Sequence, residues 1–130
     1  MIQDKRDFLQ RMIRNLEKVM LKFTGLDLEL HFEEMALTID KYLVEVLKVN
    51  ESDSEEEITL KMMDLSSKTD FKELELLTDV LIYKGKFTQD KKYLSAAYKI
   101  LSEIEQKDLM TFSFVRQQKL TELQSLIQKQ

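Results

Sequence analysis

Residues 71–83 of this chain, FKELELLTDVLIY, decide the fold that the sequence predicts. At about 100° per residue, the apolar side chains of this segment cover well over half of the circumference of a helix. The charged residues Lys72, Glu75 and Asp79 share one narrow arc with Lys86, just beyond the segment. A helix that is apolar on so many sides must pack against more than one neighbour. The pattern therefore predicts a helix at the centre of a bundle.

The ends of this central helix also follow from the sequence. Asp70 and Glu73 have the spacing of an N-terminal capping pair, and Gly85 stands where we expect the helix to end. Asp90 is a good N-cap for a second helix, and the short connection before it forces the two helices antiparallel. The second helix has a narrower apolar face, which comprises Tyr93, Ala97, Ile100, Leu101 and Ile104.

The spacing of small and large residues in these two helices resembles the tetratricopeptide helix hairpin. Ala97 follows Gly85 by twelve residues, Leu101 and Ile104 come four and seven residues later, and Leu81 stands for the large first apolar residue. The sequence departs from that family at Lys84, Thr88 and Leu109, where the family has leucine, an aromatic residue and proline. The resemblance covers residues 81–109 and implies one hairpin, because a repeat array needs about three units. The whole chain is also loosely similar to a small, uncharacterised helical family of Gram-positive bacteria, which implies no activity.

Length and composition predict a single all-α domain. The chain has 130 residues, 43% hydrophobic and 34% charged, with two glycines and no proline. The absence of cysteine excludes disulfides and thiolate metal sites and suits a reducing compartment. Residues 1–14 do not have the pattern of a secretory signal, and no run of eighteen apolar residues predicts a transmembrane segment. We therefore expect a cytoplasmic protein, bacterial in style.

The remaining segments predict a compact bundle of about six helices. Residues 1–49 hold a helix pair, with helices at 4–23 and 28–49, and residues 50–57 form an acidic linker. Residues 58–68 read as a short helix, although their apolar residues also alternate as a strand would. Residues 69–130 form the tetratricopeptide-like hairpin and a closing helix, capped by Thr111 or Ser113, with Phe112 and Phe114 as a hydrophobic staple at its start. The closing helix carries Val115, Leu123, Leu126 and Ile127 as its apolar residues.

No motif in the sequence indicates catalysis or a cofactor. His31, the only histidine, lies among Glu29, Glu33 and Glu34, but it lacks the Glu-x-x-His pairs of a metal site in a helical bundle. The acidic run 51–57 lacks the glycine of a calcium loop, so we expect a solvated, mobile linker there. There is no glycine-rich phosphate loop and no cysteine nucleophile. We expect no enzyme, no metal site and no cofactor.

Two surfaces suggest a binding function. The first helix carries a basic stripe that comprises Arg11, Arg14, Lys18 and Lys22. This stripe is a solvated face, a partner for the acidic run, or a site for anionic lipid or nucleic acid. The net charge of −4 argues against nucleic acid. Leu30 and Leu37 fall opposite the apolar face of the second helix, so either that helix starts later or a second neighbour covers them. With Leu60 and Met63 they favour a protein–protein interaction module of unknown partner, and a homodimer stays open. The alternative function is a peripheral anion binder.

Overall fold

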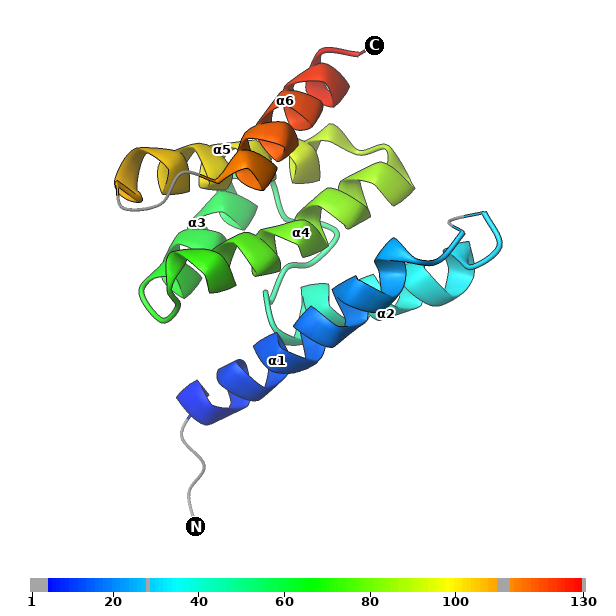
Figure 1. The fold of residues 1–130 in the computed structure, drawn as a ribbon, viewed down its shortest axis with the longest axis horizontal. Coiled ribbons are helices and arrows are strands. Elements are labelled where there is room, and N and C mark those ends of the chain that lie inside the picture. Colours follow the sequence, from blue (N-terminus) through cyan, green and yellow to red (C-terminus); the bar gives the residue numbers. More distant parts are fainter. Residues whose placement is uncertain (1–4, 28, 110–112, 130) are drawn as a thin grey trace.

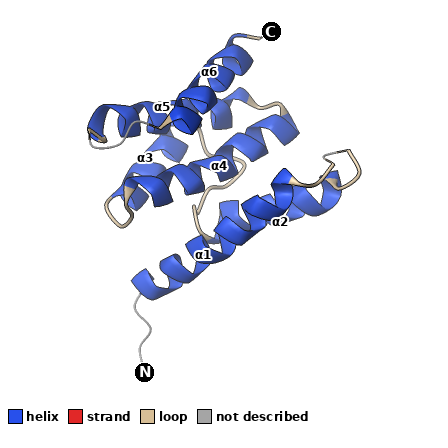
Figure 2. Cartoon of the chain, viewed as in Figure 1, coloured by secondary structure: helices blue, strands red, loops and turns tan. Residues whose placement is uncertain are grey.

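A computed structural model describes residues 5–27, 29–109 and 113–129 of the chain. These ranges contain six helices and no strand, which confirms the all-α bundle (Figures 1 and 2). The helices are α1 (Lys5–Thr24), α2 (Phe32–Glu45), α3 (Glu55–Ser66), α4 (Phe71–Thr88), α5 (Lys91–Lys107) and α6 (Phe114–Gln128).

Helix α4 is the centre of the bundle, as its sequence predicts. It packs against α1, α2, α3 and α5. In Figure 1 it lies between the α1–α2 pair and the helices of the C-terminal half. Leu77, Val80 and Leu81 have no exposed surface. Burial of this kind stabilises the fold by about 1.5–3 kcal/mol for each large apolar side chain.

Side-chain caps fix where four of the helices begin. In α3 the Glu57 amide donates to Ser54 Oγ while the Ser54 amide donates to Glu57 Oε1, both at 3.2 Å. Asp70 and Glu73 form the same reciprocal box at the start of α4, as predicted. The remaining two caps are Asp90 for α5 and Ser113 for α6. Thr111, the alternative cap of α6, lies outside the described residues.

Gly85 lies inside α4, so the prediction that it ends the helix is wrong. The helix continues to Thr88, and Gln89 ends it in the left-handed conformation with φ 56°. A Cβ added to Gly85 would stand 2.6 Å from Cδ2 of Leu94. The glycine is needed because α5 approaches α4 closely there. The α4–α5 hairpin is present, and its tetratricopeptide-like character stays a prediction.

Helix α2 is shorter than the predicted span 28–49. Before it, the Glu29 amide donates to Asp27 Oδ1 in a turn, and Leu28 lies outside the described residues. After it, Lys48 adopts a positive φ of 60°. The apolar pattern continues past the helix because Val46, Leu47 and Val49 are buried in an irregular segment. Leu30 therefore precedes the helix. Of the two explanations offered for Leu30, the later start of the helix is the one observed.

The acidic segment 50–57 is anchored to the fold at Asp53, which is not solvated as predicted, whereas Glu51, Ser52, Glu56 and Glu57 are exposed. Asp53 is buried, accepts a hydrogen bond from the Asn50 amide at 3.0 Å and pairs with Lys61. Lys92 donates to the carbonyl of Glu51, and Lys99 pairs with Glu55. The segment also ends earlier than predicted, since α3 begins at Glu55 instead of residue 58 and ends at Ser66 instead of residue 68. The strand alternative for this region is excluded.

Helix α6 is held by charged as well as apolar side chains. Arg116 is buried, and its Nε donates to Glu105 Oε2 of α5 at 2.7 Å. Lys119 lies 2.9 Å from Asp79 Oδ1 of α4. Leu123 is buried as predicted, and Leu126 and Ile127 pack partly buried against the core. Val115 and Phe114 are exposed, which contradicts the predicted apolar face and staple, and Phe112 lies outside the described residues.

Candidate functional site

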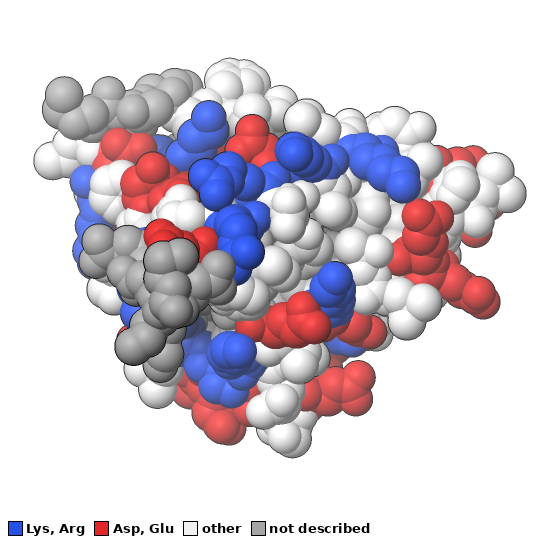
Figure 3. Space-filling view, turned by 90° about the horizontal axis from the view of Figure 1, so that it is seen from below, with Lys and Arg blue, Asp and Glu red and all other residues white. Residues whose placement is uncertain are grey.

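The predicted basic stripe lies on the side of α1 that faces away from the core. Leu9, Ile13, Leu16 and Met20 are buried on the opposite side. The helical period of 3.6 residues therefore turns the stripe toward solvent. Its residues, Arg11, Arg14, Lys18 and Lys22, are all exposed. Figure 3 looks at the molecule from the side of α1 and α2 and shows Lys and Arg side chains in a row across this face.

Two large apolar side chains are exposed on the outward side of α2. Leu37 is 72% exposed and Val44 is 53% exposed, and the two residues lie seven positions apart on one side of the helix. Lys41 is exposed between them. Met35, Ile39 and Leu43 are buried on the opposite side. We define the α1–α2 outer face as Arg11, Arg14, Lys18, Lys22, Leu37, Lys41 and Val44.

The other predicted apolar surface residues lie outside this face. Leu30 is 80% exposed in the turn before α2, at the edge of a shallow polar hollow. Leu60 is exposed on α3, whereas Met63 packs half-buried against the core. The structure therefore places Leu37 on the outward side of α2, Leu30 in the turn before α2, and Leu60 on α3.

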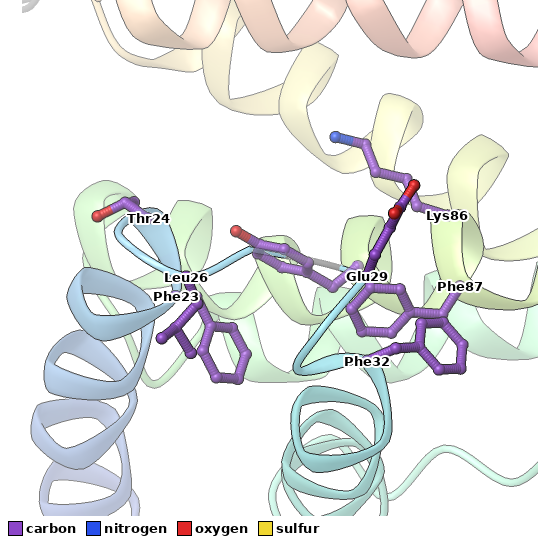
Figure 4. A pocket seen from close by; sticks show the side chains of 8 residues that line it. Phe23, Thr24, Leu26, Glu29, Phe32, Lys86 and Phe87 are labelled. Carbon is purple, nitrogen blue, oxygen red and sulfur yellow. The ribbon is translucent and has the colours of Figure 1, made fainter.

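An open cleft of about 660 Å³ lies where the end of α1 meets the start of α2 and the last turns of α4. Four aromatic rings form a chain in it (Figure 4). The ring centroids of Phe23 and Tyr83 are 5.7 Å apart, those of Tyr83 and Phe87 5.8 Å, and those of Phe87 and Phe32 5.1 Å. Two of these pairs have the edge-to-face geometry that aromatic rings prefer. The rings therefore fill and stiffen the cleft walls.

The rim of this cleft carries one charge of each sign. Glu29 and Lys86 extend toward the same side of it in Figure 4. Lys86 already pairs with Glu122 of α6. Burial, and then the nearby charge of Asp79, raises the pKa of Tyr83 above its ordinary value of 10.0. The cleft has the size of a small-molecule site, but it lacks the group of convergent polar side chains that fixes a ligand.

The sequence gives little signal for this cleft. Tyr83 and Phe87 lie four residues apart in α4 and so share one side of that helix. Phe23 and Phe32 come from two other helices, and only the packing of those helices on α4 brings the rings together.

His31 lies in the turn before α2 and is half-buried. Its Nδ1 is 3.7 Å from Glu34 Oε2, and Glu34 also lies 3.5 Å from Lys22 Nζ. In the part of the chain that the structure describes, no three His, Asp or Glu side chains converge as a metal site requires. The arrangement ties the end of α1 to the start of α2.

The buried cations are engaged in ion pairs between helices. Lys84 of α4 is buried, and its Nζ lies 2.8 Å from Asp40 Oδ1 of α2. Although burial acts to lower it, the hydrogen bond and charge of Asp40 raise the pKa of Lys84 above its ordinary value. An amine in this state is protonated and holds two helices together. A nucleophilic lysine instead has an unpaired amine with a lowered pKa.

None of the described helices is both long enough and apolar enough to cross a lipid bilayer. Comparisons with protein-family models, with curated proteins and with solved structures give no match to this chain.

Proposed function

We propose that this chain is a non-enzymatic protein-interaction module that binds its partner through the α1–α2 outer face. The observation that carries the proposal is the exposure of Leu37 and Val44 on one side of α2. Single exposed apolar residues are ordinary on protein surfaces. Two large ones in line on one helix, flanked by the exposed charged residues Glu33, Lys41 and Glu45, have the composition of an apolar interface centre with a polar rim.

The test compares two surface variants of the full chain. Leu37→Asp/Val44→Asp places carboxylates on the apolar row, and Leu60→Asp makes the same change at an exposed residue of α3. We expect the wild type and Leu60→Asp to capture the same protein from the native cell by crosslinking and mass spectrometry, and the double variant to lose it. Equal capture by all three proteins would contradict the proposal. Light scattering then decides whether the captured protein is a second copy of the 15.5 kDa chain.

The second candidate function is a peripheral anion binder, and the exposed basic stripe of α1 favours it. This function predicts binding to phosphatidylserine vesicles or duplex DNA at low salt, with a steep loss at higher salt because phosphate contacts release counterions. Arg14→Glu/Lys18→Glu would abolish that binding. If neither vesicles nor DNA bind at low salt, this candidate is excluded.

A further inference from the structure

The cleft lined by Phe23, Phe32, Tyr83 and Phe87, which we call the aromatic cleft, presents ring surface to solvent (Figure 4). Phe32 is 44% exposed, Tyr83 and Phe87 are half-buried, and Phe23 is buried. The face of an aromatic ring carries negative charge density, so several ring walls around one opening attract a cation. At about 660 Å³ the cleft has room for a small organic cation.

The charged side chains that line the aromatic cleft favour a cation over an anion. Glu29 is exposed at the rim and makes no ion pair with any residue that the structure describes. Lys86, on the same rim, pairs with Glu122 of α6. The positive charge of Lys86 is therefore balanced within the fold, whereas the negative charge of Glu29 is left for a ligand.

The charges that act on the Tyr83 hydroxyl indicate the same preference. Burial raises the pKa of Tyr83 most, Asp79 and Glu122 raise it further, and Lys119 lowers it. Two anions and one cation therefore act on a hydroxyl that belongs to the cleft wall. A positive ligand would be stabilised in this field, and a negative one would be repelled.

A tyrosine elsewhere in the fold already has cations near its ring. Lys92 Nζ lies 5.2 Å from the ring centroid of Tyr93, and Lys84 Nζ lies 6.0 Å from it. Among the described residues, no lysine takes such a position over a ring of the aromatic cleft. The faces of the cleft rings are therefore open to a cation from outside the chain.

The polar groups of the cleft suit a cation that donates no hydrogen bond. An ammonium of the lysine type has three N–H donors, which need acceptors when it leaves water. Of the described residues that line the cleft, Glu29 alone carries a carboxylate, and the Thr24 hydroxyl already donates to the Leu21 carbonyl at 2.7 Å. A quaternary ammonium has no N–H and an apolar surface of methyl groups. The small number of polar groups is therefore no obstacle to its binding.

We propose that the aromatic cleft binds the trimethylammonium group of a small quaternary ammonium compound of the choline type. Its methyl groups lie against the rings of Phe32, Tyr83 and Phe87, and the carboxylate of Glu29 balances its charge. Ring faces take the place of hydrogen bonds in this mode of recognition. The cleft shares no residue with the α1–α2 outer face, so this inference goes beyond the proposed function and does not depend on it.

The test titrates the isotope-labelled full chain with choline and follows the amide chemical shifts by NMR. A parallel titration uses the neutral isostere of choline, the alcohol in which tert-butyl replaces trimethylammonium. The two compounds have the same shape, so they differ in charge alone. We expect choline to bind with a Kd of about 1 mM or tighter, and the isostere to bind about tenfold more weakly. The shifts should concentrate on the residues that line the aromatic cleft.

Two variants test the parts of the site. Phe32→Leu keeps an apolar side chain at an exposed position and removes one ring, so it should weaken choline by about three- to tenfold and leave the isostere nearly unchanged. Glu29→Gln removes the carboxylate and should weaken choline by a similar factor. The matched controls are Phe114→Leu, at an exposed phenylalanine of α6, and Glu56→Gln, at an exposed carboxylate of α3. Both controls should bind choline as the wild type does.

The comparison of the two ligands on the wild type needs no variant, so it holds even if a variant fails to fold. Equal binding of choline and its isostere would overturn the inference, because the cleft would then accept apolar groups whatever their charge. Absence of shifts with choline at about 10 mM, well above the expected Kd, would also overturn it. The same applies if Phe32→Leu binds choline as tightly as the wild type. Binding of phosphatidylcholine vesicles without binding of free choline would overturn the small-molecule ligand.

Discussion

Leu94 of α5 packs directly onto Gly85 of α4. A Cβ at position 85 would stand 2.6 Å from Leu94 Cδ2, 2.7 Å from its Cγ and 3.3 Å from its backbone nitrogen. We expect Gly85→Ala to lower the free energy of unfolding by about 1–3 kcal/mol, because an overpacked core must shift. This loss exceeds the gain of about 1 kcal/mol from the better helix propensity of alanine. Urea denaturation measures the change.

The control for this prediction is the other glycine. A Cβ at Gly25 would meet only the Lys22 carbonyl at 3.8 Å, an ordinary contact. Gly25→Ala should therefore change stability by less than about 0.5 kcal/mol. Equal effects of the two substitutions would show that the close contact with Leu94 does not restrict position 85 to glycine.

Arg116 should be the most important charged residue for docking of α6. It is 3% exposed, and its guanidinium lies near Glu105, Glu75 and Asp108 at 2.7, 3.5 and 3.6 Å. Arg116→Met leaves these carboxylates without their cation and should cost about 2 kcal/mol. This lies below the ~3–5 kcal/mol of fully buried pairs because water still reaches the carboxylates.

The matched control for Arg116 is Lys68→Met, which removes an exposed ion pair with Asp64 at 3.4 Å. Pairs of this kind contribute about 0–1 kcal/mol, so urea midpoints of the control should stay near the wild type. If Arg116→Met unfolds at the same urea concentration as the control, α6 is held by its apolar contacts instead.

Asp53 should make the fold sensitive to acid. The hydrogen bond from Lys61, followed by that from the Asn50 amide, holds the pKa of Asp53 below its ordinary value of 3.8. The unfolded chain therefore binds a proton at Asp53 more readily than the folded one. The stability from this carboxylate is present above pH 3.8 and is lost as the pH falls through the lower, folded pKa.

Urea midpoints between about pH 7 and about pH 2.5 test this linkage. Asp53→Asn should be less stable than the wild type at neutral pH, and the difference should shrink on acidification. Asp64→Asn, at an exposed carboxylate, serves as the control and should follow the wild type throughout. A difference that does not depend on pH would assign Asp53 a role in packing alone.

The rings of Phe32 and Phe87 should be energetically coupled. Their centroids are 5.1 Å apart with an interplanar angle of 67°. A double-mutant cycle of Phe32→Ala and Phe87→Ala should give a coupling of about 0.5–1.5 kcal/mol in unfolding free energy. Strictly additive effects would mean that the two rings border the cleft without stabilising each other.

The architecture follows from the sequence where one side chain decides one local structure. Ser54 with Glu57 and Asp70 with Glu73 encode their capping boxes within four residues, and the wide apolar coverage of 71–83 encodes the central position of α4. These signals are local, so no tertiary contact is needed to interpret them.

The wrong predictions concern residues whose role is set by distant neighbours. Val49 belongs to the apolar pattern of α2 yet is buried beyond its end, in an irregular segment. Asp53 looks like one more acid in a solvated run, and only the position of Lys61 makes it a buried anchor. Gly85 looks like a helix terminator in the sequence. The contact that leaves no room for a side chain there is with Leu94, nine residues away.

The candidate site was predictable in part for the same reason. The spacing of Arg14 and Lys18 places them on one side of a helix, and Leu37 is opposite the buried residues of α2 by periodicity alone. How the outward sides of α1 and α2 are oriented relative to each other depends on how both helices pack on α4, which no local pattern encodes.

The principal contacts of α1 and of α2 with the rest of the bundle are those with α4. Force applied to the N-terminal pair therefore reaches α5 by way of α4, across the junction where Leu94 rests on position 85. Pulling on the chain from its beginning should detach α1 and then α2 from α4, and the C-terminal helices should unravel at a higher load.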